Sequence, residues 1–232
     1  MVHLIIPCAG RASRMGELAR EVPKTLLQVA GRPILARLVE DVIATGVGVR
    51  VLTRPDDVQI RAWAQRHGSK VQTQQVPSAP YGTLILRAAG PDQEVAAVDG
   101  DLAMPPGGLT NFLDFASREV PAVDLVIGVT QIPWDLGPTT IWWDPHSSDR
   151  PIGRGLPSPA ARLAGLYWLR PAALTRLRAY VDAGHTSYSA FLTTFSRSET
   201  AAFELGYAYN INTPDDLAAA NAHAAQHEEV KR

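Results

Sequence analysis

The sequence is poor in cysteine, in net charge and in long hydrophobic runs. Its single cysteine, Cys8, excludes an internal disulfide framework and is typical of a reducing compartment. The formal net charge of −1 argues against a general binder of nucleic acid or anionic membranes, because such proteins carry a large basic excess. The N-terminal apolar run, Leu4 to Ile6, is too short for a signal peptide, and no run approaches the roughly 20 residues of a membrane span. These absences predict a cytoplasmic protein that binds neither nucleic acid nor a membrane.

What the sequence has is a regular alternation of strand-like and helical segments over its first half. A chain of 232 residues, 46% of them hydrophobic, is long enough for one α/β domain with a full core. Near-continuous apolar strands between amphipathic helices predict a mostly parallel central sheet with helices on both faces, a single Rossmann-like domain. The predicted strands are 2–6, 49–53, 70–76, 94–100 and 124–130, and the predicted helices are 33–46, 56–68, 83–89 and 109–117.

The second half is less regular. The patterns predict strands at 139–143 and 161–169 and a helix at 172–184. The Pro-, Gly- and Ser-rich stretch 144–159 is expected to be a loop, and whether it closes over a ligand is left open. A last helix begins after Thr213, a good N-cap residue followed by proline.

Cationic side chains gather directly after the first strand. Two small residues, Ala9 and Gly10, would let backbone N–H groups approach an anion closely there. Arg14 can offer a forked pair of donors to phosphate oxygens, and Lys24 adds a point charge. A surface loop with solvated arginines is the alternative. The cluster comprises Arg11, Arg14, Arg20, Lys24, Arg32 and Arg37, against only Glu17 and Glu21.

Two carboxylates, Asp99 and Asp101, follow the strand at 94–100. They would repel each other unless they are solvated or hold a cation, and oxygen ligands beside a phosphate site suit Mg²⁺. An ordinary Asp-Gly turn is the alternative. Because ligands bind beyond the carboxyl ends of parallel strands, we expect "PCAGRAS" and "DGD" to be neighbours in space.

Several separated motifs resemble the signature of the nucleoside-triphosphate transferase family, which includes the sugar-phosphate nucleotidyltransferases and small cytidylyltransferases. The clear matches cover residues 2–101 and 207–220. The matching pieces are Pro7-Cys8-Ala9-Gly10, Arg14-Met15, Pro23-Lys24, Gly31-Arg32-Pro33-Ile34-Leu35, "PYGTL", "VDGD" and "YNINTPDDLAAA".

The resemblance implies a glycosyltransferase-A-like fold, with a nucleotide-binding half at 1–129 and an acceptor-binding half at 130–232. It implies transfer of a nucleoside monophosphate from a nucleoside triphosphate to a phosphorylated acceptor, a sugar 1-phosphate or a small phosphorylated alcohol or phosphonate, with release of pyrophosphate and with Mg²⁺ as cofactor. The implied catalytic residues are Arg14, Lys24 and Asp101, and the implied metal ligands are Asp101, Asn210 and Asn212. The implied nucleotide-binding residues are Pro7, Cys8, Ala9, Gly10, Arg11, Arg14, Lys24, Gly82, Thr83 and Asp99.

The sequence departs from the family pattern where the acceptor should bind. Ala12 replaces the second glycine of the opening loop, and Cys8 replaces an alanine, where it is expected to pack as a small hydrophobic side chain. The E-K-P segment of the sugar-phosphate enzymes is missing before residues 164–167. Candidate acceptor contacts are Arg150, Arg154 and Arg162 for a phosphate and Tyr167, Trp142 or Trp143 for a ring, with the two tryptophans on opposite faces of their strand.

Two other functions stay open at this point. The "DGD" stretch is an Asp-x-Asp motif, as in glycosyltransferases that use nucleotide sugars, although that function leaves Arg14 and Lys24 unexplained. A non-catalytic nucleotide sensor on the same domain is the second. His223 and His227 lie four residues apart on the last helix, but two ligands do not make a zinc site. The base, the acceptor and the formation of a homodimer are left open.

Overall fold

The computed structural model describes residues 3–10, 13–90, 93–118, 123–131, 141–154 and 161–229. Nine strands in these ranges form one sheet. They are β1 (His3–Pro7), β4 (Gly48–Thr53), β5 (Val71–Gln75), β6 (Val95–Val98), β8 (Leu125–Thr130), β9 (Ile141–Trp143), β10 (Ile152–Arg154), β11 (Ala161–Leu169) and β12 (Thr200–Leu205). Two short pairs lie outside it: β2 (Gln28–Val29) with β3 (Arg32–Pro33), and β7 (Leu102–Ala103) with β13 (Tyr209–Asn210).

The sheet is mostly parallel, as the alternation predicted. Its order is β10-β9-β11-β6-β1-β4-β5, and β8 pairs with both β11 and β12. Parallel pairing joins β1 to β4 and β6, β4 to β5, and β8 to β12, whereas β11 runs antiparallel to β6 and β8. The strands β1, β4 and β6 therefore end at the same edge of the sheet, where ligands of such sheets bind.

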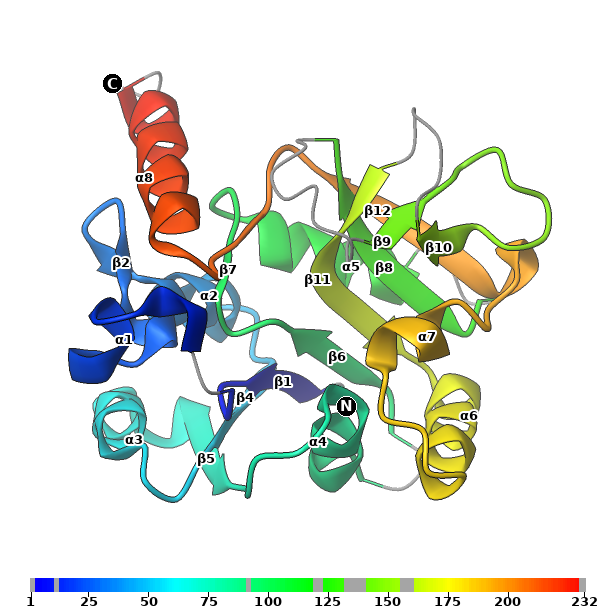
Figure 1. Ribbon diagram of the computed structural model, residues 1–232, viewed down its shortest axis with the longest axis horizontal. Helices are drawn as coiled ribbons and strands as arrows, with labels where there is room; N and C mark the ends of the chain where they lie inside the picture. Colours follow the sequence, from blue (N-terminus) through cyan, green and yellow to red (C-terminus); the bar gives the residue numbers. More distant parts are fainter. Residues whose placement is uncertain are drawn as a thin grey trace.

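Helices cover both faces of the sheet (Figure 1). Strand side chains alternate between the faces, so Leu4 and Ile6 of β1 join one core cluster and Ile5 joins the other. The first cluster includes side chains of α2 (Ile34–Ile43), α3 (Val58–Gln65), α5 (Gly108–Arg118) and α8 (Pro214–Glu229). The second includes side chains of α4 (Tyr81–Ala88), α6 (Pro171–Asp182) and α7 (Tyr188–Leu192). The prediction of helices on both faces is thus confirmed.

The stretch 144–159 is not wholly a loop, so that prediction is wrong in part. Strand β10 lies inside it and pairs antiparallel with β9. Asp144 and Pro151 close the hairpin through a backbone hydrogen bond of 2.7 Å, and the Asp144 carboxylate accepts a 2.8 Å bond from the N–H of His146. Burial of Ile152, only 2% exposed, favours strand pairing over a solvated loop. Residues 155–159 of the stretch lie outside the described ranges.

Helix α8 fixes the β2–β3 hairpin, beside which it stands in Figure 1. Its Asn221 accepts a 3.0 Å hydrogen bond from the N–H of Ala30 and donates to the carbonyl of Gln28 at 3.2 Å. Thr213 caps the helix as predicted, because its hydroxyl accepts a hydrogen bond from the N–H of Asp216 at 3.2 Å. None of the helices in the described ranges combines the length and the apolar character that a bilayer crossing requires.

Candidate active site

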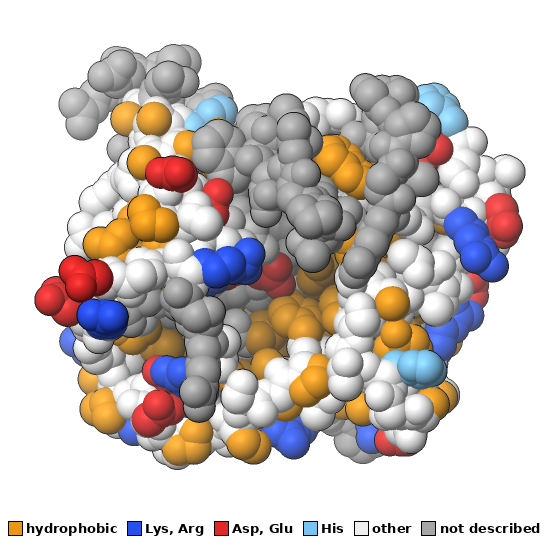
Figure 2. All heavy atoms as spheres, in the orientation of Figure 1, with side chains coloured by type: hydrophobic (Ala, Val, Ile, Leu, Met, Phe, Trp, Pro, Cys, Tyr) orange, Lys and Arg blue, Asp and Glu red, His pale blue; other side chains and the backbone are white. Residues whose placement is uncertain are grey.

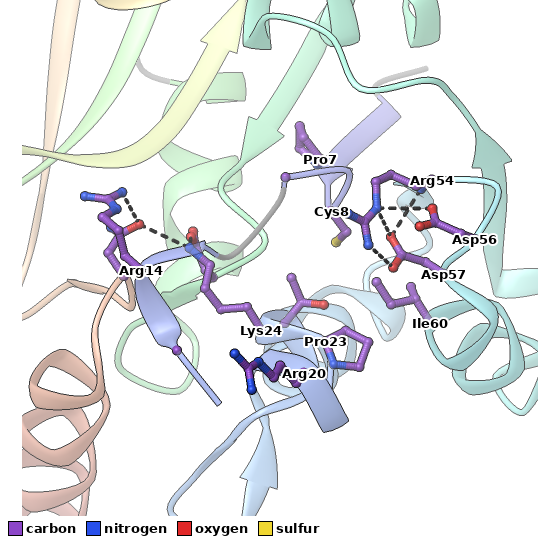
Figure 3. A pocket seen from close by; sticks show the side chains of 15 residues that line it. Pro7, Cys8, Arg14, Arg20, Pro23, Lys24, Arg54, Asp56, Asp57 and Ile60 are labelled. Carbon is purple, nitrogen blue, oxygen red and sulfur yellow. Dashed lines mark hydrogen bonds and ion pairs between the residues drawn. The ribbon is translucent and has the colours of Figure 1, made fainter. Parts of the chain in front are cut away.

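A cleft of about 730 Å³ opens at the carboxyl ends of β1 and β4. The short helical segments that follow β1 supply one wall: a 3₁₀ turn at Ser13–Met15, α1 (Leu18–Glu21) and a second 3₁₀ turn at Lys24–Leu26. Figure 3 shows the cleft from close by, with the cationic side chains extending into it. Among the predicted site residues, those that line it are Pro7, Cys8, Gly10, Arg14, Lys24, Asp101 and Asn212.

Two cations and a carboxylate meet in this cleft. Lys24 forms an ion pair with Asp101, and both side chains are largely buried, at 17% and 16% exposed. The amide oxygen of Asn212 accepts hydrogen bonds from Arg14 Nη2 at 2.7 Å and from Lys24 Nζ at 3.1 Å, and dashed lines run from both side chains in Figure 3. The structure therefore brings together residues from the opening loop, from the end of β6 and from the segment before α8, as the motifs predicted.

Asp99 lies deeper and connects to the same network. Its carboxylate accepts a 3.0 Å hydrogen bond from Nδ2 of Asn210, whose own Oδ1 accepts one from Asn212 at 2.9 Å. Burial raises the pKa of the Asp99 carboxyl above its ordinary value, and the negative charge of Asp101 raises it further. A continuous chain of polar contacts thus runs from Asp99 through the two asparagines to Arg14 and Lys24.

The donor atoms at this end of the cleft suit a hard divalent cation. Over the described ranges no group of three or more His, Cys, Asp or Glu side chains is arranged so that it could hold a metal ion by itself. Mg²⁺ needs fewer, because it takes one or two carboxylates and completes its octahedron with water and substrate phosphates. Asp101, with the amide oxygens of Asn210 and Asn212 beside it, provides such a set of oxygen donors.

Cys8 packs as a small hydrophobic side chain, as predicted. It is 6% exposed, and burial raises the pKa of its thiol well above the ordinary value, which keeps it protonated. Gly100 lies directly against it: a Cβ on Gly100 would be 2.8 Å from Cys8 Sγ and 2.9 Å from the carbonyl oxygen of Pro7. The predicted neighbourhood of "PCAG" and "DGD" is therefore a tight packing contact.

One pair of cleft residues, Arg54 and Asp57, was not predicted from the sequence. Arg54 follows β4, and Asp57 holds its guanidinium with two hydrogen bonds, 2.8 Å from Nη2 and 3.2 Å from Nε. This hydrogen bonding raises the pKa of Arg54. No motif marks the pair, and the available signal was its position: Arg54 stands at the carboxyl end of a parallel strand, as Asp101 does, and Figure 3 shows it across the cleft from Lys24.

Other predicted residues lie elsewhere. Gly82 faces α6 from within α4, where a Cβ would be 2.9 Å from Leu177 Cδ1, and Thr83 follows it on the same helix, partly buried. Ala9 is buried at 1% exposure. Arg11 lies outside the described residues.

The candidate acceptor contacts separate into buried and exposed groups. Arg162 is buried and donates a 3.0 Å hydrogen bond to the carbonyl of Ala208, so it has a structural contact, whereas Arg150 is exposed. Trp143 is 4% exposed beneath the guanidinium of Arg197, and Trp142 is half-buried, which agrees with opposite faces of one strand. The side chain of Arg154 is not among those that the structure describes.

Comparisons with known proteins identify a family and agree with the fold. The model of the MobA-like NTP transferase domain family matches residues 4–124. No curated protein matches the sequence. Among solved structures, UDP-glucose pyrophosphorylase from Acinetobacter baumanii is 16% identical with a TM-score of 0.72, over 96% of this chain and 93% of that one. The inositol-1-phosphate CTP transferase from T. maritima is 14% identical with a TM-score of 0.72, over 92% of this chain and 90% of that one. At such identities the likeness shows the fold.

Proposed function

This chain belongs to the MobA-like NTP transferase domain family, whose model matches more than half of it, and we propose on that basis a nucleotidyl transfer with two substrates. The chain takes a nucleoside monophosphate from a nucleoside triphosphate and places it on a phosphorylated small molecule, releasing pyrophosphate. The observation that carries the proposal is the convergence of Arg14, Lys24 and Asp101 around Asn212 in one cleft.

The reaction is a substitution at phosphorus. A phosphate oxygen of the acceptor attacks the α-phosphorus, and the bond from that phosphorus to the α,β-bridging oxygen breaks as pyrophosphate leaves. The protein contributes positioning and charge neutralisation rather than a covalent intermediate. Arg14 and Lys24 are the groups that offset the charge accumulating on the pyrophosphate, because both extend into the cleft from the loop after β1.

The metal belongs to the carboxylate end of the cleft. Asp101 would hold Mg²⁺ together with an amide oxygen of Asn210 or Asn212, and the bound ion would supply Lewis-acid charge neutralisation at the phosphates. Asn212 has a second task in this chain: its Oδ1 fixes the orientation of Arg14 and Lys24 toward the same point.

Each half of the chain binds one of the two substrates. Residues 1–129 hold the nucleotide, with the Pro7–Gly10 backbone at its centre. Residues 130–232 supply the acceptor side. An Asp-x-Asp glycosyltransferase is disfavoured, because such an enzyme gives no role to Arg14 and Lys24. Assembly into a homodimer stays a prediction.

The test is pyrophosphate release with Mg²⁺, the common nucleoside triphosphates in turn, and a panel of phosphorylated acceptors. We expect release that requires an acceptor, and a loss of at least about 100-fold in kcat/KM for Lys24→Ala. Lys70→Ala, at an exposed lysine on the turn before β5, is the matched control and should keep full activity. Full activity of Lys24→Ala, or triphosphate hydrolysis without an acceptor, would contradict the proposal.

A further inference from the structure

Three tyrosines from distant parts of the chain meet beside the cleft. Tyr81 comes from the first turn of α4, Tyr167 from β11 and Tyr188 from the first turn of α7. Their ring centroids are 4.8 Å apart for Tyr81 and Tyr188, 5.1 Å for Tyr167 and Tyr188, and 6.0 Å for Tyr81 and Tyr167. Tyr81 and Tyr188 are only half-buried, so parts of their rings remain accessible. We call these three residues the tyrosine cluster.

The tyrosine cluster lies beside the partly buried Asp99, whose N–H donates a 2.9 Å hydrogen bond to the carbonyl of Gly165, two residues before Tyr167. Burial raises the pKa of all three phenols, and the negative charge of Asp99 raises each of them further. The hydroxyl of Tyr188 is buried and has no hydrogen-bond partner among the described residues, whereas the buried hydroxyl of Tyr81 interacts with the Asp99 carboxylate. A buried hydroxyl without a hydrogen-bond partner destabilises the fold unless a ligand or a water molecule supplies the missing hydrogen bond.

Asp99 lacks a cationic partner over the described part of the chain. The groups that interact directly with its side chain are neutral, the amide of Asn210 and the hydroxyl of Tyr81, while the ammonium of Lys24 pairs with Asp101 and acts on Asp99 only through its charge. A partly buried carboxylate without an opposite charge in direct contact is unfavourable. Aromatic faces next to it attract the same kind of group that the carboxylate requires, namely a cation.

The position of the cluster is that of an acceptor site. Asp99 lies two residues before Asp101, and Tyr167 and Tyr188 belong to the second half of the chain. In the orientation of Figure 1, a hollow opens over β6, with hydrophobic side chains on its floor and acidic and basic side chains on its border (Figure 2). A small molecule in this hollow would have one end near the charged cleft.

We propose that the acceptor is a small phosphate or phosphonate carrying an ammonium group, bound with its nitrogen against the tyrosine cluster and Asp99 and its phosphoryl group toward Lys24 and Asp101. The inference rests on the proposed function and names the substrate class of that site. A hexose phosphate offers hydroxyl groups but no positive charge, so it would leave Asp99 uncompensated. An ammonium group a few carbon atoms from the phosphoryl group would form an ion pair with the Asp99 carboxylate and cation–π contacts with the tyrosine rings.

A binding measurement tests the predicted preference for an ammonium group without requiring turnover. Phosphocholine and 3,3-dimethylbutyl phosphate have nearly the same shape and differ in the charge of one atom. Calorimetry on the wild-type protein with Mg²⁺ should find phosphocholine binding at least about tenfold more tightly than its neutral isostere. Equal affinities, or tighter binding of the neutral compound, would overturn the inference whatever the protein's activity.

Turnover separates the inference from the proposed function. The acceptors are phosphocholine, phosphoethanolamine, 2-aminoethylphosphonate, 3,3-dimethylbutyl phosphate and glucose 1-phosphate. Pyrophosphate release that is fastest with phosphocholine, phosphoethanolamine or 2-aminoethylphosphonate supports both the inference and the proposed function. The preferred acceptor among these three shows whether the site takes a quaternary or a primary ammonium. Release that is fastest with glucose 1-phosphate or the neutral isostere overturns the inference and keeps the transferase. Absence of acceptor-dependent release throughout rejects both.

Substitutions locate the recognition. Tyr188→Phe keeps the aromatic face and should keep the preference for phosphocholine over the isostere, whereas Tyr188→Leu should lose most of it, about tenfold. The control is Phe115→Leu, which removes a half-buried aromatic ring from α5 on the opposite face of the sheet. An unchanged preference in a folded Tyr188→Leu variant, or an equal loss in Phe115→Leu, would contradict the assignment.

Discussion

The ammonium of Lys24 pairs with the carboxylate of Asp101, joining the loop after β1 to the end of β6. Both side chains are largely buried, so separating the pair is unfavourable unless a ligand replaces the lost contact. On the proposed function, the pair therefore holds the group assigned to the leaving pyrophosphate and the group assigned to the metal close together before substrate binds.

Asp101→Asn should reduce kcat/KM by at least about 100-fold, because it removes the charge that binds the metal while preserving the size of the side chain. The measurement is pyrophosphate release over a series of Mg²⁺ concentrations, in which the variant should need far more metal. Asp114→Asn, on the exposed surface of α5, is the control. A variant with wild-type activity and wild-type metal dependence would disprove the metal assignment.

Arg54 is expected to bind the phosphates of the nucleotide, with Asp57 holding it in place through the forked contact. Arg54→Gln should raise the Kd for the triphosphate about tenfold, because a tenfold change corresponds to the free energy that one charged hydrogen bond contributes. Asp57→Asn should weaken binding in the same direction, since the guanidinium loses its ionic partner. Calorimetric titration of the triphosphate measures both.

The control for this pair is Asp56→Asn. Asp56 is exposed and contacts Arg54 through one distance of 3.3 Å, so its neutralisation should change nucleotide affinity little. Equal effects of the Asp56 and Asp57 substitutions, or none from Arg54→Gln, would show that the pair serves only the loop after β4.

Gly165→Ala and Gly184→Ala form a matched comparison. Both glycines have left-handed backbone angles, with φ of 81° and 86°, so alanine should reduce stability by about 1 kcal/mol at either position. Only at Gly165 would the new Cβ be 2.5 Å from Asp99 Oδ2, whereas no atom lies within 4 Å at Gly184. We expect Gly165→Ala to lose about 2 kcal/mol more in denaturant unfolding and to lose acceptor-dependent activity. Similar losses at both positions would indicate that Asp99 adapts to the intrusion.

The Arg176–Glu199 ion pair should make stability depend on pH. The hydrogen bond from Arg176, with those from the backbone and hydroxyl of Ser196, lowers the pKa of Glu199 from 4.5 to about 2. A lowered pKa contributes stability above the unfolded value and loses it as pH falls through the folded one. Glu199→Gln should therefore unfold about 1 kcal/mol more easily at pH 7, after allowance for solvent screening of this partly exposed pair, with the difference shrinking from pH 5 toward pH 2. A difference that is constant over that range would refute the assignment, and Glu204→Gln, exposed on β12, is the control.

The parts of the fold that the sequence predicted are those with a local signal. Strands β1, β4, β6 and β8 carry apolar runs of the right length, and helices α2, α3, α4 and α5 carry an apolar face, so periodicity located them. Strand β10 has three residues and forms because β9 is available to pair with it, which no local pattern reveals. Strand β12 in the same way depends on β8 for its partner.

The residues of the site also differ in whether a local sequence signal predicts them. Arg14, Lys24 and Asp101 could be predicted because they occupy fixed places in motifs. Tyr167 was a candidate acceptor contact, but the tyrosine cluster as a whole could not be predicted, since its members meet only after α4, β11 and α7 pack together. The spacing of Tyr81 and Tyr188 along the chain does not indicate that their rings lie 4.8 Å apart. Contacts between distant segments are set by packing, which is where sequence patterns stop being informative.

The most direct test of the central claim is a ³¹P NMR spectrum of the wild-type protein with Mg²⁺, a nucleoside triphosphate and the acceptor series. Nucleotidyl transfer predicts that the triphosphate signals disappear as pyrophosphate accumulates, together with two coupled signals from a new phosphoanhydride between the α-phosphorus and the acceptor. Orthophosphate with nucleoside diphosphate, or a triphosphate that stays intact with every acceptor, would contradict it.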